Sequence, residues 1–293
     1  MGLGWIGMGR KFAFRQGGIS WSTYWTRQSK VGDYGTGDGS SYDNAWNGFT
    51  SIDWSKIKPG DTLYICGTHN ESLRIGASGT ESKYITIRGD YVGDTGIIDG
   101  EDTRTRCIDI NENSYVHIEA ITLTQATESC LYVDGASIIT TKDITVSESG
   151  NEGVQHINTC QATHTNITAI NNVDDGISGH DSAVINIIGG IISGNDQGIN
   201  IIDDVHCTII GTIVFSSNVT NDIFATIATT DGSCWIDVTG AIIPVNVTAS
   251  EGGKVVLTNC NIAGTVIIGL SGKGYMVGSG NTYSGAVTFG KTA

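Results

Sequence analysis

The clearest pattern in the chain is a strand-like segment that returns about every 23 residues. Short apolar segments bounded by polar turns begin at ten positions: Tyr84, Cys107, Cys130, Gly153, Gly176, Gly198, Asp222, Val245, Thr265 and Ala286. Each unit opens with a segment such as CIDI or GINI, crosses a polar turn and continues into a longer one such as AVINIIGGII. The chain is therefore read as a repeat protein whose units bury their apolar faces only against their neighbours.

Within each unit, apolar and polar residues alternate with the two-residue period of a β-strand. One set of equivalent positions is apolar and is expected to point inward: Ile108, Leu131, Val154, Ile177 and Ile199. The next set is expected to face outward: Asp109, Tyr132, Gln155, Ser178 and Asn200. A helical repeat of this length would show a period of about 3.6 residues instead.

The composition also favours strands. There are 40 isoleucines and only 7 leucines, and β-branched side chains suit a pleated sheet better than a helix. Units of roughly 20 to 25 residues with two or three short strands stack as coils of a parallel β-helix, about 4.8 Å apart. We expect an all-β protein with about nine such coils, in which many of the 41 glycines occupy tight corners.

The coil period and the segment GTGDGSSYDNAWNGFTSIDWSKIKPGDTLYICGTHNES resemble the right-handed parallel β-helix superfamily, which includes pectate-lyase-like enzymes and phage tailspikes. The resemblance covers Asp33–Phe289. It implies a single-stranded right-handed β-helix over residues 84–293, an N-terminal cap and first coil over 33–83, and an N-terminal arm over 1–32. The cap would be a short amphipathic helix over 44–57, with apolar side chains against the open end of the first coil: Ala45, Trp46, Phe49, Ile52 and Trp54.

The two ends of the chain suggest contacts with other chains. The segment before the repeat clusters Trp21, Tyr24 and Trp25 after a glycine-rich start. It is either an attachment arm or an extra strand folded against the first coil. At the other end, no polar cap follows the last coil, although an exposed parallel edge invites pairing. This favours a closed oligomer, and the likeness to tailspikes implies a homotrimer.

Charge restricts the function further. The net charge is −14, and the stretch from Cys107 to Glu251 holds 18 acidic residues and one basic residue, Lys142. Such a surface repels nucleic acid and acidic membranes, and no apolar run of about 18 residues predicts membrane insertion. Polyuronate lyases of this fold need Lys, Arg or calcium, so the charge disfavours lyase activity unless the acidic residues recruit calcium.

Glycoside hydrolysis is the alternative chemistry, since it needs two carboxyl groups on either side of the bond that breaks. The segment NNVDDGISGHDS and the next coil hold the candidate catalytic residues: Asp174, Asp175, His180, Asp181, Asp203 and Asp204. Asp175 or Asp181 would act as the acid, Asp203 as the base, and His180 as a hydrogen-bonding partner. The string DDGIS-GHD resembles the acidic pair and histidine of polygalacturonase-like hydrolases, but it lacks their basic substrate-binding residues.

The same acidic positions permit other interpretations. Glu128, Glu152 and Asp196 lie in the same register, so all of these acids can be turn residues that cap backbone groups. A calcium site in the acidic cluster is a third interpretation; no other cofactor is expected. The seven cysteines lack a CxxC pair and are expected to be buried small hydrophobes rather than metal ligands. The candidate carbohydrate-binding residues are Tyr132, Gln155 and Asn200, with Tyr132 as an exposed ring that stacks on a sugar.

Together these patterns favour a bacteriophage virion appendage of the tail-spike or fibre type. It would be a homotrimeric β-helix that attaches to other virion proteins through residues 1–32 and contacts host-surface glycans, with or without cleaving them. The lack of a signal-peptide pattern at the start of the sequence favours synthesis in the host cytoplasm. The alternative is a secreted carbohydrate-active enzyme, a glycoside hydrolase before a polysaccharide lyase.

Overall fold

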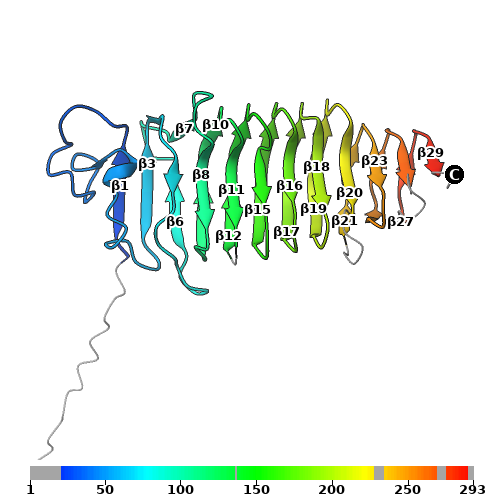
Figure 1. Ribbon diagram of the computed structural model, residues 1–293, viewed down its shortest axis with the longest axis horizontal. Coiled ribbons are helices and arrows are strands. Elements are labelled where there is room, and N and C mark those ends of the chain that lie inside the picture. The colour runs from blue at the N-terminus through cyan, green and yellow to red at the C-terminus, as the bar shows by residue number, and fades with distance from the viewer. Residues whose placement is uncertain (1–20, 136, 228–233, 269–274, 290–293) are drawn as a thin grey trace, which may run out of the picture.

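The computed structural model describes residues 21–135, 137–227, 234–268 and 275–289. Over these residues the chain winds into a rod, with β1 (Thr23–Arg27) at one end and β29 (Val287–Phe289) at the other (Figure 1). Strands of successive coils lie side by side and pair in parallel. The predicted parallel β-helix is confirmed. No helix in these ranges is long and apolar enough to cross a bilayer.

One sheet has ten strands, one from each coil that contributes to it. In order along the rod they are β5 (Leu73–Arg74), β8 (Arg106–Asn111), β11 (Ser129–Asp134), β14 (Val154–His156), β16 (Asp175–Gly179), β18 (Gln197–Ile202), β20 (Asn221–Thr226), β23 (Val247–Ala249), β26 (Val266–Ile268) and β29.

The other sheet has 19 strands because it turns a corner and forms two runs. Three long strands cross the corner and belong to both runs: β15 (Gln161–Ile170), β17 (Val184–Ser193) and β19 (His206–Ser216). The remaining strands of the first run are β1, β3 (Thr62–Cys66), β6 (Ile85–Arg88), β9 (Val116–Glu119), β12 (Ile138–Lys142), β21 (Trp235–Thr239), β24 (Lys254–Thr258) and β27 (Tyr275–Ser279). Those of the second run are β4 (Thr68–His69), β7 (Ile97–Asp99), β10 (Thr122–Thr124), β13 (Thr145–Ser147), β22 (Ile242–Ile243), β25 (Asn261–Ile262) and β28 (Thr282–Tyr283). The remaining strand, β2 (Trp46–Asn47), pairs with β1 on the side away from β3.

The rod has about eleven coils, two more than the sequence period predicts. The additional coils are those of β1 and β3, which precede the first regular repeat. Thr23–Arg27 pairs along its whole length with Thr62–Cys66, although a long irregular segment separates them in sequence. The period could not reveal them because that separation is not one repeat.

The predicted capping helix over residues 44–57 is wrong. This segment forms β2, a single 3-10 turn η1 (Phe49–Ser51) and irregular chain. Gly48 lies in the left-handed region at φ 78, and its N–H donates to the Arg27 carbonyl, so pairing with β1 replaces helical hydrogen bonds. The apolar residues are nevertheless buried as expected: Ala45, Trp46, Phe49 and Ile52.

The aromatic residues of the predicted arm take part in the first coil. Tyr24 stacks on Trp46 with ring centroids 5.2 Å apart, and Trp25 stacks on Tyr64 at 6.0 Å. Trp21 remains 49% exposed. Residues 23–27 are therefore an extra strand folded against the β-helix, which is one of the two interpretations above. Residues 1–20, the remainder of the predicted attachment arm, lie outside the described residues.

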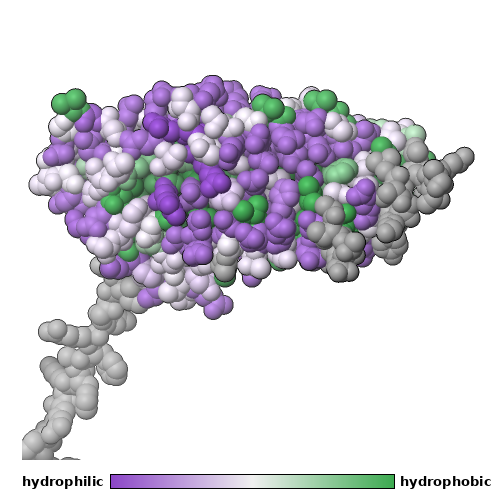
Figure 2. All heavy atoms as spheres, viewed as in Figure 1, coloured by the Kyte–Doolittle hydropathy of each residue, from purple (hydrophilic) through white to green (hydrophobic). Residues whose placement is uncertain are grey.

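The interior consists of apolar columns that run along the rod. Leu131 pairs with Ile108 and Val154, and Ile177 pairs with Val154 and Ile199, as predicted. All five side chains are fully buried, and burying each contributes roughly 1.5 to 3 kcal/mol. The seven cysteines are also free and buried. The outer surface in view in Figure 2 is largely hydrophilic, with small and separate apolar spots.

Buried asparagines join successive coils at one corner. The Oδ1 atoms of Asn172, Asn195 and Asn218 accept hydrogen bonds from the backbone N–H groups of Ser149, Asn172 and Asn195, at 3.0 to 3.1 Å. Each acceptor lies one coil beyond its donor. Buried backbone donors need such partners wherever the strand ladder is interrupted, so this asparagine series stabilises the corner between the two sheets.

A chain of hydrogen-bonded polar side chains crosses the interior from one sheet to the other. The Nε2 atoms of His156 and His164 are 2.9 Å apart, and both rings are fully buried. His156 Nδ1 donates to the Ser178 carbonyl at 2.9 Å, so its Nε2 accepts from His164. His164 Nδ1 then accepts from the Thr141 hydroxyl at 2.8 Å. Two neutral rings therefore satisfy every hydrogen bond and link the two sheets.

This histidine pair predicts acid sensitivity. Burial lowers the pKa of His156 to about 4 and that of His164 well below its ordinary value. The unfolded chain has a histidine pKa of about 6.5, so it binds more protons than the folded chain. The contribution of the two neutral histidines to the free energy of unfolding is therefore fully present above about pH 6.5. It decreases at lower pH, by up to about 1.4 kcal/mol per histidine per pH unit.

Replacing both residues, His156→Gln with His164→Gln, should reduce the decline of the melting temperature between about pH 7 and pH 5, leaving the part that comes from His69, whose pKa burial also lowers to about 4. Thermal melts followed by circular dichroism measure this decline. His206→Gln is the matched control, because the His206 side chain is 47% exposed. An equally steep decline in the double variant and the wild type would show that other groups titrate.

Candidate functional site

The outer face of the ten-stranded sheet carries a continuous polar column. Strand pairing aligns, in successive coils, Arg74, Asp109, Tyr132, Gln155, Ser178 and Asn200. The predicted outward column is therefore confirmed and extends to Arg74. Its members are less accessible than expected, since Tyr132 is 7%, Ser178 0% and Asn200 8% exposed.

Tyr132 is not the exposed sugar platform that the sequence suggested. The Arg106 guanidinium lies over its ring, 3.2 Å from the centroid, and also pairs with Asp109 at 3.5 Å. Neighbouring coils are close enough for long side chains to cover one another across the column. Gln155 is likewise engaged, because its Nε2 donates to Glu152 Oε1 at 3.1 Å.

Three carboxyl groups meet on this face. Single oxygens of Glu152, Asp174 and Asp175 all lie within 4.8 Å of one another. Glu152 and Asp175 are buried and Asp174 is exposed. Burial, and secondarily the charge of Asp174, raise the pKa of Asp175 to about 8. Burial and Asp196 also raise the pKa of Asp174, against the opposing charge of His180. The cluster therefore favours a bound proton or cation.

Unpaired oxygens surround Asp175. Asn200 Nδ2 donates to Asp175 Oδ2 at 2.9 Å. The other oxygen of that carboxylate, the Asn200 Oδ1 atom and the Ser178 hydroxyl are all buried without a hydrogen-bond partner. Unpaired buried polar atoms are costly, and their gathering at one place calls for a ligand. Carboxylate and amide oxygens are ligands that Ca²⁺ prefers, so these residues fit calcium.

Glycine allows the coils to approach closely beside the cluster. A Cβ atom added at Gly153, Gly176 or Gly198 would lie 2.6 to 2.7 Å from a backbone carbonyl oxygen of the next coil. These glycines are needed for close approach rather than for a left-handed turn, which differs from the corner role expected from sequence. Because Gly176 follows Asp175 directly, the close approach helps to bring the acids of adjacent coils together.

The structure brings together only some of the predicted catalytic residues. Asp174 and Asp175 are in the cluster, and His180 is close enough to influence Asp174. Asp181 and Asp203 occupy equivalent positions of adjacent coils. The strand pairs on either side of them, Gly179–Ile201 and Val184–His206, are separated by the same number of residues as these two acids. Both acids have left-handed backbones, with φ 53 and φ 67, which is typical of turns. Asp204 is exposed beside Asp203.

The residue that sequence reasoning missed is Glu152. It was grouped with Glu128 and Asp196 as a turn acid, although it precedes Asp175 by 23 residues. That separation equals the offset between Val154 and Ile177, which pair in adjacent coils. The repeat therefore contained the signal, but only the side-chain directions show that Glu152 joins the cluster.

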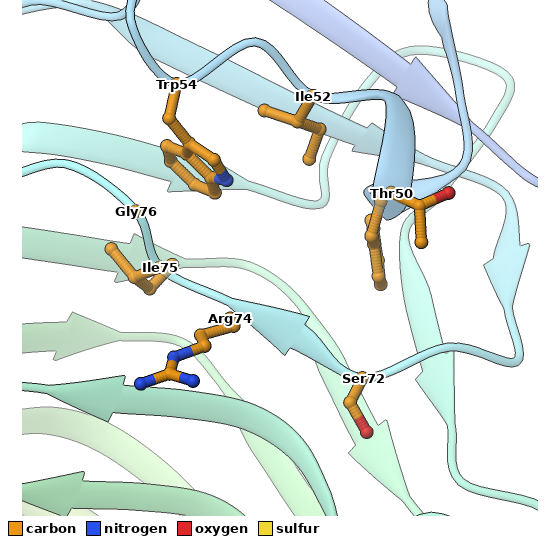
Figure 3. Close-up of a pocket in the computed structure, with 8 residues that line it drawn as sticks. Thr50, Ile52, Trp54, Ser72, Arg74, Ile75 and Gly76 are labelled. Atoms are coloured by element: carbon orange, nitrogen blue, oxygen red, sulfur yellow. The ribbon is translucent and has the colours of Figure 1, made fainter.

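A cavity of about 350 Å³ opens at the N-terminal end of the same face. Trp54 and Ile52 form one wall, and Ser72, Arg74 and Gly76 form the other (Figure 3). Trp54 lies against Gly76, where an added Cβ would be 2.6 Å from the indole. Since Arg74 begins the polar column, the cavity and the carboxylate cluster share one face, four coils or roughly 19 Å apart.

Comparison with known proteins finds structural rather than sequence relatives. No protein-family model matches the chain, and no curated protein matches its sequence. The solved structure of pectate lyase Pel9A superimposes with a TM-score of 0.62 and 14% identity, over 92% of this chain and 79% of that one. An alginate lyase from Paenibacillus sp. str. FPU-7 gives 0.52 and 16%, over 82% and 95%.

The protein is a right-handed parallel β-helix. At these identities the likeness concerns the fold, and the function has to be argued from the site. The outer face of this β-helix carries the carboxylate cluster and the polar column that joins it to the Trp54 cavity.

The cluster predicts a calcium effect that Asp175 controls. The folded pKa of Asp175 lies above the unfolded value of about 3.9. Without a cation, stability therefore falls as the pH rises from about 4 towards 8. Calcium at 100 times its Kd should restore about 2.7 kcal/mol at pH 8, or roughly 4 °C in Tm for a chain of 293 residues.

The variant Asp175→Asn should raise the Tm in EDTA at pH 8, because it removes a buried charge, and should abolish the calcium increment. Asp181→Asn, in the following turn, is the matched control and should keep the increment. Differential scanning calorimetry measures both. A calcium increment of the same size in Asp175→Asn would rule out the cluster as the site.

Proposed function

We propose that the protein binds an extended glycan along the outer face of the ten-stranded sheet, with a calcium ion held by Glu152, Asp174 and Asp175. Asp175 carries this proposal, because its buried carboxylate lies close to two other carboxyl groups and keeps one oxygen without a protein partner. Calcium takes about six to eight oxygen ligands. The ion would neutralise the cluster and offer its remaining positions to sugar oxygens.

The shape of the face supports a polymer as the ligand. The polar column leads without interruption from the cluster to Arg74 and the cavity beside Trp54. An aromatic side chain and a cation at one end, and a calcium site at the other, suit a chain of sugars that carries acidic groups. The two structural neighbours are by name a pectate lyase and an alginate lyase, which supports this class of ligand.

Binding is favoured over cleavage because Lys and Arg side chains are few on this face, and Arg106 is already engaged by the Tyr132 ring and Asp109. Lys142 is the single Lys or Arg residue between Cys107 and Glu251 in the sequence. It belongs to β12 of the 19-stranded sheet, away from the cluster. Polysaccharide lysis is the second candidate, because His180 is close to Asp174 and is a general base of suitable type. Hydrolysis by Asp175 or Asp181 with Asp203 as base remains the third.

The biological setting that we propose is a bacteriophage appendage. A homotrimer of this β-helix, attached through the residues that precede β1 and made in the host cytoplasm, would present its acidic coils to host-surface glycans. The alternative is a secreted carbohydrate-active enzyme. Sedimentation equilibrium tests the assembly, since a trimer of the 30.8 kDa chain is expected, and a monomer at micromolar concentration would contradict it.

Glycan binding is tested with polygalacturonate, alginate and dextran immobilised on beads, in calcium and in EDTA. We expect retention on one or both acidic polymers in calcium, at least a tenfold loss with Asp175→Asn or Trp54→Ala, and wild-type retention with Asp181→Asn. Ultraviolet absorbance of unsaturated products in the same incubations reports lysis. Equal retention of wild type and Asp175→Asn on every polymer would refute the proposal.

A further inference from the structure

A second cavity, of about 590 Å³, opens on the outer face of the 19-stranded sheet. Its floor is one row of adjacent outward positions, because His117 pairs with Thr86 in the preceding coil and with Thr140 in the next. Trp21, Lys83 and Tyr84 line it as well. This cavity lies on a different sheet from the carboxylate cluster, so the two sites are separate.

The lining of this cavity is unusual for so acidic a chain. None of its eight lining residues is Asp or Glu, although the chain carries a net charge of −14. Lys83 contributes a positive charge and His117 an imidazole. The closest carboxylate partner of His117 is Glu119, 3.4 Å from Nε2, and Glu119 also binds Arg88 at 3.0 Å. Burial, and to a smaller extent the charges of Tyr115 and Glu81, raise the pKa of Tyr84, so a further carboxylate lies nearby. Lys83 is therefore the group of this lining that can attract an anion.

Trp21 gives the cavity an aromatic wall. A Cβ atom at Gly60 would lie 2.3 Å from the indole ring, so glycine at that position lets the ring rest on the backbone. The Lys83 ammonium is 4.9 Å from the Trp21 ring centroid, and 49% of Trp21 remains exposed. Amphipathic ligands with an apolar face and polar edges suit a wall of this kind.

The floor supplies hydrogen-bonding groups in defined orientations. His117 Nδ1 is 2.7 Å from the Thr140 hydroxyl, which fixes the imidazole ring. The Thr86 hydroxyl lies in the same row, one coil before His117. Hydroxyls and an imidazole spaced by one coil, about 4.8 Å, match the spread of hydroxyl groups around a sugar ring.

We propose that this cavity binds one sugar unit bearing a carboxylate or sulfate group, with the ring against Trp21 and the acidic group at Lys83. Binding of this sugar would need neither calcium nor the outer face of the ten-stranded sheet. Two glycan sites on one rod would raise the avidity for a densely substituted surface.

The test is a titration of the wild-type protein with galacturonic acid, galactose 6-sulfate and galactose, followed by NMR of the six tryptophan indole N–H signals. The Trp21 signal is identified by its loss in Trp21→Phe. We expect saturable shifts of that signal with one or both acidic sugars, at Kd values near 1 mM or below, and at least tenfold weaker binding of galactose. Lys83→Gln should reduce the affinity for the acidic sugars to that for galactose.

Trp235→Ala is the matched control, because Trp235 is 39% exposed and also has a lysine, Lys254, over its ring at 3.6 Å. Asp175→Asn is the control for the other site. Both should leave the Trp21 shifts unchanged. The proposal is overturned if no acidic sugar shifts the Trp21 signal up to about 10 mM, if Trp235 responds with the same concentration dependence, or if Lys83→Gln binds as the wild type does.

Discussion

Backbone pairing between equivalent residues of successive coils is the constraint on which this molecule depends. A single coil leaves its N–H and C=O groups unpaired, so the chain is stable only when each coil lies in register on the next. Register then turns every position of the repeat into a column. Leu131 lies between Ile108 and Val154 for this reason, and the abundance of isoleucine reflects a preference for side chains that stack on themselves.

The same register creates the candidate site. Acidic residues that are 22 or 23 positions apart in sequence become neighbours in space, whether or not their charges favour it. Glu152, Asp174 and Asp175 are held together by the pairing of their strands, and the resulting repulsion, which hydrogen bonds from Gln155 and Asn200 reduce, favours a bound proton or cation. On the surface of a rod, a function can therefore arise from a few substitutions in adjacent coils without any change of backbone.

Much of the fold can be predicted from the sequence, because each repeat unit is a short continuous segment. The period, the apolar column and the burial of the cysteines follow from counting residues. The coils of β1 and β3 could not be found this way, since a long irregular segment separates them, and the segment 44–57 pairs with β1 instead of forming a helix. Burial of Tyr132 beneath Arg106 depends on side-chain directions that a period does not contain.

The candidate site was predictable to the extent that it lies in the repeat. Asp174 and Asp175 were found because they are consecutive in a distinctive string, whereas Glu152 was assigned to a turn like Glu128. Asp181 and Asp203 do occupy equivalent positions of adjacent coils, but their backbone conformations indicate turns. Sequence spacing thus shows which residues share a coil position, and only the geometry of the strand ends shows which of them converge.

The asparagine series at Asn172, Asn195 and Asn218 has a consequence for how such a protein can evolve. Each amide binds the backbone of the coil before it, so the series tolerates the gain or loss of a complete coil but not of part of one. The length of the rod is thus a discrete variable. Duplicating one coil would lengthen the molecule by a single step and would carry any surface group on that coil along with it.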